Sequence, residues 1–163
     1  MPAEPQHKCA SATGVSAKPS STSSASTASF FISDVIIAEK ANLQSRLAPH
    51  ASRPTHRVAF HAPCTLQHGL KKKGAVEELL TELGFNLTPV ADAHLCCGSA
   101  GTYSILQPEL SNKLRDNKIA ALTEGAPQAI LTANIGCQSQ LQNATTLPVR
   151  HWIEALDDLI GCS

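Results

Sequence analysis

The sequence lacks net charge, because its 163 residues contain 13 Lys and Arg side chains and 13 Asp and Glu side chains. Residues 58–163 carry seven basic side chains against ten acidic ones. A mildly acidic folded part argues against a phosphate-binding surface, so we expect no nucleic acid among its partners. The chain also lacks any apolar run approaching the ~18 residues of a membrane span. We therefore expect membrane association only indirectly, through partners.

A secretory signal is missing as well, because the N-terminus has no basic segment followed by an apolar core. We expect a reducing, cytoplasmic location, peripheral to the inner face of the membrane at most. In such a compartment, clustered cysteines more often serve metal or redox chemistry than structural disulfides. The chain contains six of them: Cys9, Cys64, Cys96, Cys97, Cys137 and Cys162.

Large apolar residues are almost absent from residues 10–29, where sixteen of twenty residues are Ser, Thr or Ala. Such a segment cannot bury enough surface to offset its ordering entropy. We therefore predict a disordered tail over residues 1–32. Residues 33–56 would contain one helix, capped by Asp34 and ending at Leu47, followed by a linker. A folded domain would span residues 57–161.

From Arg57 onward, segments typical of strands and of helices alternate. Three short apolar segments predict strands: residues 57–64 (RVAFHAPC), where the strand runs into a turn at Pro63, residues 85–90 (FNLTPV) and residues 128–137 (QAILTANIGC). Three segments with helical spacing predict helices: residues 74–84, residues 107–125 and a last helix marked by Trp152. This alternation predicts an α/β fold of three layers, a mostly parallel sheet with crossover helices.

Four cysteines follow the predicted strands. Cys64 comes after the first strand, the adjacent Cys96 and Cys97 after the second, and Cys137 at the end of the third. Open parallel sheets form sites outside the carboxyl ends of their strands. Adjacent cysteines reach one object only where the chain turns, and Gly98 permits such a turn. We therefore expect the four thiols to share one site.

Several interpretations of these cysteines stay open. They can be small buried hydrophobes, or they can bind zinc, although no CxxC pair of the usual structural zinc site occurs. A redox disulfide between Cys96 and Cys97 would be strained, because their Cα separation is below the usual range. An iron–sulfur cluster suits the spacing better, since it takes thiolates from several directions.

Two histidines precede these cysteines closely and are candidates for the same site. His61 lies three residues before Cys64, and His94 lies two residues before Cys96. Either can be a ligand or can donate a hydrogen bond to a ligand, as Gly98 can through its backbone. The plain alternative is that both histidines are half-buried and bonded to backbone carbonyls.

The motifs HAPC (61–64), CCGSAG (96–101) and NIGC (134–137) resemble the CCG cysteine-rich domain, a family that also occurs in heterodisulfide reductase. Longer strings, such as HAPCTLQHGLK and DAHLCCGSAGTYSILQPELSNKLRDNK, resemble the C-terminal end of the iron–sulfur subunit of bacterial glycolate oxidase. The likeness covers about residues 57–160.

This resemblance implies an iron–sulfur subunit that passes electrons from a flavin-containing subunit, which oxidises glycolate to glyoxylate, toward quinone. It also implies that Cys64, Cys96, Cys97 and Cys137 bind the cluster, of the [4Fe–4S] type. The oxidation of glycolate would belong to the flavin partner, so no catalytic acid or base is assigned here.

The sequence also departs from the family pattern. Gln140 stands where the closing CxxC motif often has a further cysteine, and the ferredoxin-type motifs of the family's N-terminal half are missing. We therefore expect a C-terminal fragment of such a subunit. Two other functions remain open: a scaffold that keeps partner contacts without a cluster, and a small zinc-binding or thiol-redox protein.

Overall fold

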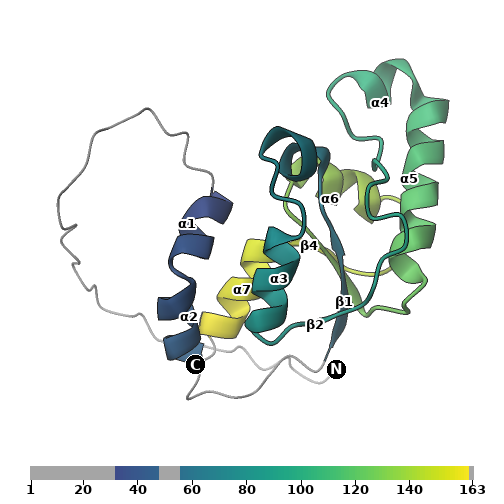
Figure 1. The fold of residues 1–163 in the computed structure, drawn as a ribbon. Helices are drawn as coiled ribbons and strands as arrows, with labels where there is room; N and C mark the ends of the chain where they lie inside the picture. Colours follow the sequence, from purple (N-terminus) through teal and green to yellow (C-terminus); the bar gives the residue numbers. More distant parts are fainter. Residues whose placement is uncertain (1–31, 48–55, 162–163) are drawn as a thin grey trace, which may run out of the picture.

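The computed structural model describes residues 32–47 and 56–161 (Figure 1). The tail predicted over residues 1–32 lies outside the described residues except for Ile32, and so do residues 48–55 of the predicted linker, Cys9 and Cys162. The described elements are α1 (Ile32–Ala38), α2 (Lys40–Leu47), β1 (Arg57–His61), η1 (Thr65–Gly69, a π-helical turn), α3 (Ala75–Glu82), β2 (Asn86–Leu87), α4 (Tyr103–Leu106), α5 (Pro108–Thr123), β3 (Ala129–Thr132), α6 (Ile135–Gln142), β4 (Val149–His151) and α7 (Trp152–Gly161).

The four strands form one sheet in the order β2-β1-β3-β4, and every neighbouring pair is parallel. The predicted parallel α/β fold is therefore confirmed. The chain moves from β1 outward to β2 and then returns past β1 to β3. The strand order thus reverses between β1 and β3, and in open α/β sheets the crevice at such a reversal is where ligands bind.

Helices cover both faces of the sheet and make it the middle of three layers. α3 and α7 lie on one face, with α1 and α2 beyond them, and α5 lies on the other (Figure 1). Alternate residues of β1 serve the two faces, because successive side chains of a strand point to opposite sides. Val58 and Phe60 join the core under α3 and α7, whereas Ala59 joins the core under α5 and α6.

The larger core is built from the apolar side of the predicted helix over residues 74–84. Val76, Leu79, Leu80 and Leu83 of this segment are all buried, which confirms the spacing that predicted it. They pack with Trp152 of the last helix in the same cluster. Burying such side chains contributes about 1.5–3 kcal/mol each.

Some predicted boundaries are wrong. The single helix expected from Asp34 to Leu47 is two helices interrupted at Glu39, and Asp34 lies inside α1 rather than capping it. The third strand ends at Thr132, so Cys137 belongs to the first turn of α6. Asn134 caps this helix, since its side chain accepts hydrogen bonds from the backbone N–H groups of Gly136 and Cys137. Strand β4 is absent from the sequence prediction.

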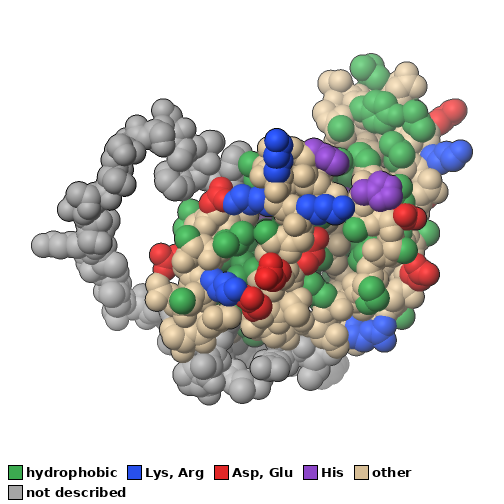
Figure 2. Space-filling model, viewed as in Figure 1, with side chains coloured by type: hydrophobic (Ala, Val, Ile, Leu, Met, Phe, Trp, Pro, Cys, Tyr) green, Lys and Arg blue, Asp and Glu red, His purple; other side chains and the backbone are tan. Residues whose placement is uncertain are grey.

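The face of the molecule drawn in Figure 2 carries charges of both signs, with Lys and Arg side chains interspersed among Asp and Glu side chains. This mixture agrees with the equal numbers of basic and acidic side chains in the sequence. None of the helices in the described ranges is long and apolar enough to cross a membrane.

Candidate metal centre

The carboxyl end of β1 begins the candidate site. His61 is its last residue, and it is 1% exposed. It lies in register with Thr132, the last residue of β3. Because both residues end central strands on the two sides of the strand-order reversal, His61 stands at the crevice that this topology creates.

Two buried cysteines meet His61 there. The ligand atoms of His61, Cys97 and Cys137 all lie within 4.8 Å of one another, and all three residues are buried. Neither buried ring nitrogen of His61 makes a hydrogen bond of normal geometry among the described residues, although the ring lies close enough to Cys97 to lower the pKa of that thiol. Buried polar groups are rarely left unpaired in native proteins. An imidazole without a partner beside two thiols is therefore a sign of a group that binds between them.

Cys64 and Cys96 complete the set on the more open side. Cys64 precedes η1 and is exposed, and Cys96 is intermediate between buried and exposed. The thiol of Cys96 lies close enough to that of Cys64 to raise its pKa. Partial burial raises the pKa of the Cys64 thiol, and negative charge on Cys96 and Cys97 raises it further. The structure thus brings Cys64 and the double cysteine together, as the strand-end pattern predicts.

The two buried cysteines, Cys97 and Cys137, shift each other's pKa in opposite directions. Interaction between the two thiols, which lie within 4.8 Å of each other, lowers the pKa of Cys97 and raises that of Cys137. His61 and Ser99 also lower the pKa of Cys97. Ser99 Oγ lies 3.2 Å from Cys97 Sγ and 3.4 Å from Cys137 Sγ. The site therefore favours a negatively charged sulfur at Cys97, which is the form that binds metal.

The turn after the double cysteine depends on Gly98. Its φ is +78°, and its backbone N–H donates a hydrogen bond to Cys96 Sγ at 3.3 Å. A Cβ at this position would overlap the backbone carbonyl oxygen of Ser111 on α5. Only glycine combines this left-handed conformation with such a close approach. Gly98 therefore allows the backbone of the cysteine loop to contact the backbone of α5 directly.

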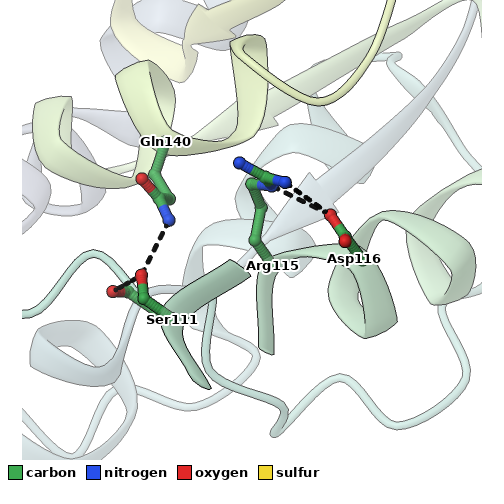
Figure 3. Close-up of polar contacts among 5 residues, drawn as sticks. Ser111, Arg115, Asp116 and Gln140 are labelled. Carbon is green, nitrogen blue, oxygen red and sulfur yellow. Dashed lines mark hydrogen bonds and ion pairs between the residues drawn. The ribbon is translucent and has the colours of Figure 1, made fainter. Parts of the chain in front are cut away.

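Gln140 supports this contact through its side-chain amide. Its Nε2 donates a hydrogen bond to Ser111 Oγ at 3.0 Å, and Ser111 Oγ donates to Gly98 O at 2.8 Å. Figure 3 shows Gln140 of α6 and Ser111 of α5 pointing toward each other, while Arg115 pairs with the neighbouring Asp116. Where the family pattern often has a further cysteine, this chain thus has an amide that joins two helices to the cysteine loop.

A second contact anchors the loop before the double cysteine. The carbonyl oxygen of Ala93 accepts hydrogen bonds from Lys118 Nζ at 3.0 Å and from Gln67 Nε2 at 3.3 Å. Gln67 lies in η1, directly after Cys64. Neither residue was predicted from the sequence, because a lysine and a glutamine in polar surroundings carry no signal of burial. The short separation between Gln67 and Cys64 is the one sequence feature that could have pointed to Gln67.

His94 and the helix N-terminus nearest the site complete the surroundings of the cysteines. His94 is exposed, and its role near the site stays a prediction. No helix begins directly after Cys97, because the chain runs through a loop to α4, which begins at Tyr103. The helix N-terminus at the site is that of α6, which contains Cys137. The local reason is Asn134, whose side-chain cap starts this helix inside the segment predicted as a strand.

Four thiols and one buried imidazole around a single crevice form a soft donor set. Thiolates select iron–sulfur clusters and zinc over hard cations such as magnesium and calcium. Ligands for a cluster must come from several directions, and here they come from the segment after β1, the loop after β2 and the first turn of α6. The residues present therefore fit an iron–sulfur cluster.

The fold and the site define a parallel α/β domain with a cysteine-rich centre at the reversal of its strand order. Comparison with protein families identifies it further, because the model described as "Cysteine-rich domain", named CCG, matches residues 58–142. The chain belongs to the CCG cysteine-rich domain family.

Among curated proteins, the glycolate oxidase iron–sulfur subunit of Escherichia coli K12 is 48% identical over a match that covers 78% of this chain and 34% of that protein. Lactate utilization protein A of Shouchella clausii is 25% identical over 62% of this chain and 45% of its own length. The probable glycolate oxidase iron–sulfur subunit of Bacillus subtilis is 34% identical over 52% of this chain and 19% of its own. The chain thus spans less than half the length of these relatives.

Proposed function

We propose that this chain is the cluster-binding C-terminal part of an iron–sulfur electron-transfer subunit, and that the complex it serves oxidises glycolate. Cys64, Cys96, Cys97 and Cys137 would hold the cluster, of the [4Fe–4S] type. A flavin-containing subunit would oxidise glycolate to glyoxylate and supply the electrons, which pass toward quinone. When bound, the cluster supplies one-electron transfer.

The observation that carries this proposal is the convergence of four cysteines from three separate segments on one crevice. Cys97 and Cys137 lie beside the unpartnered ring of His61, and Cys64 and Cys96 lie beside them on the open side. A protein with buried cysteines used only for packing would not need four of them on one edge of the sheet. The 48% identity with the Escherichia coli glycolate oxidase iron–sulfur subunit supports the proposal that the complex oxidises glycolate.

The residues around the site differ in exposure and in the hydrogen bonds that they make to sulfur. Cys97 and Cys137 are buried at 1% and 6% exposure, so they exclude water from the inner side. The exposed Cys64 leaves the outer side open to a partner. The Gly98 N–H donates to Cys96 Sγ, and the Ser99 hydroxyl lies within hydrogen-bond distance of Cys97 Sγ and Cys137 Sγ and can donate to one of them at a time. Such donors stabilise negative charge on the sulfurs and favour the reduced state.

The test is anaerobic purification of the full chain with iron, acid-labile sulfide and zinc quantified beside an absorption spectrum. The wild type is compared with Cys96→Ser and with Cys162→Ser, a control outside the matched family segment. We expect iron and sulfide in near-stoichiometric amounts in the wild type and in Cys162→Ser, and their loss in Cys96→Ser. A folded, colourless wild type without metal would refute the cluster and leave a scaffold that only contacts partners.

Zinc is the second candidate, because His61, Cys97 and Cys137 are three ligands of the types that zinc prefers. In that case the purified protein contains about one equivalent of zinc and no iron, and it shows no visible absorption. His61→Ala distinguishes the two, since it removes a zinc ligand but no cluster thiolate. Loss of bound metal in His61→Ala with retention in Cys96→Ser would favour zinc.

A further inference from the structure

Lys118 is a fully buried lysine, with an exposed fraction of 0%. It lies on α5, where the buried residues are Ser111, Lys118 and Leu122. A buried ammonium group costs free energy unless opposite charge and hydrogen bonds compensate it. An apolar side chain would fill the same space without this cost, so packing does not explain a lysine here.

The ammonium group lies where two cysteine-bearing segments meet. Its hydrogen-bond acceptor, Ala93 O, is three residues before Cys96, and the same carbonyl accepts from Gln67, three residues after Cys64. A carbonyl is neutral, so this hydrogen bond satisfies a donor of the lysine without balancing its charge. The charge must be balanced by anionic groups nearby.

Thiols of the site contribute to this balance. Burial lowers the pKa of Lys118, and negative charge raises it, with contributions from Cys97, Cys64, Asp92 and Cys96 in that order. Asp92 is exposed, so water screens its charge. Glu77 of α3 also faces the lysine: burial raises the pKa of its carboxyl, and the charge of Lys118 lowers it. Among the charges that raise the pKa of Lys118, the two largest contributions come from thiols of the site, Cys97 and Cys64.

Building on the proposed function, we propose that Lys118 is the counter-charge of the metal centre: its buried ammonium group stabilises the anionic sulfur site and raises the reduction potential of the bound cluster. One-electron reduction adds one negative charge to the site, so a fixed positive charge nearby favours the reduced state. Because the lysine is buried, salt screens this effect little.

The experiment uses the full chain, loaded with cluster under anaerobic conditions and titrated with dithionite while the reduced state is followed by electron paramagnetic resonance. Lys118→Met removes the charge and keeps the length of the side chain, and Lys118→Arg keeps the charge. Lys113→Met is the matched control, because Lys113 is an exposed lysine on the same helix.

We expect Lys118→Met to disfavour the reduced state roughly tenfold, the order of one unit charge acting through protein. For a one-electron couple, a tenfold change lowers the potential by about 59 mV. Lys118→Arg should shift the potential less, and Lys113→Met should leave it unchanged. Should Lys118→Met fail to assemble a cluster, Lys118→Gln, which keeps a donor toward Ala93 O, replaces it with the same expectation.

Equal potentials in the wild type and the charge-removing variant would overturn this inference, even if the variant is less stable to urea. Such a result would leave Lys118 with the structural task of holding the Ala93 carbonyl. Failure of the wild type to bind any cluster is a separate result, because it overturns the proposed function together with this inference.

Discussion

The contact between Gly98 and α5 gives the sharpest prediction for the architecture of the site. In Gly98→Ala, the new Cβ meets the Ser111 carbonyl group, whose oxygen it would overlap and whose carbon lies 3.1 Å away. The obstacle is helix backbone and cannot rotate aside. The substitution also forces an L-residue to keep a φ of +78°. Both effects act on the loop that holds Cys96 and Cys97.

The magnitude follows from these two effects. Left-handed backbone costs an L-residue about 1–2 kcal/mol. Relief of the overlap moves the loop away from α5, which costs about 1–3 kcal/mol as overpacking. It also breaks the Ser111 to Gly98 hydrogen bond, worth about 1 kcal/mol. We expect the free energy of unfolding to fall by about 3–6 kcal/mol, and the midpoint temperature by at least about 10 °C.

Gly74→Ala is the matched control. Gly74 has a φ of +82°, close to that of Gly98, but a Cβ there would meet nothing within 4 Å. It should therefore lose only the backbone contribution of about 1–2 kcal/mol. Urea unfolding of both variants without metal measures the difference. If Gly98→Ala is no less stable than Gly74→Ala, the loop is not pressed against α5 and the account of this turn fails.

Two further predictions concern side chains around the site. Gln140→Ala should lower the free energy of unfolding by about 1 kcal/mol, because the hydrogen bond to Ser111 is lost, and it should leave the iron content unchanged. Loss of iron without a change in stability would instead indicate that Gln140 is a metal ligand. Burial raises the folded-state pKa of Glu77 above its ordinary value of 4.5, so its favourable contribution is complete at low pH and is lost as pH rises through the raised value. Glu77→Gln should therefore have a higher free energy of unfolding than the wild type at pH 7, by at most about 1 kcal/mol after screening. This gain should shrink toward pH 4. The control is Glu78→Gln, at an exposed position, and a gain that does not depend on pH would contradict the burial of the Glu77 charge.

The errors of the sequence prediction have physical causes. Residues 128–137 are largely apolar, and such a run does not distinguish a buried strand from the first turn of a buried helix. The end of β3 is decided by Asn134, which is extended itself and caps α6 with its side chain. In helix α5 the sequence pattern misjudges which residues are buried. Its segment suggests an apolar side, yet Leu110 is 48% exposed and the polar Ser111 and Lys118 are buried.

The sequence by itself determined the parallel α/β fold, because strands and helices alternate and parallel strands need crossovers. It also placed Cys64 and the double cysteine at the same edge of the sheet, since the carboxyl ends of parallel strands meet there. Only the tertiary structure decided which polar residues surround them. The burial of Lys118, the unpartnered ring of His61 and the inward hydrogen bond of Gln140 depend on how α5 and α6 pack over the sheet. No local pattern encodes such burial, because the contacts join residues 25 to 76 positions apart along the chain.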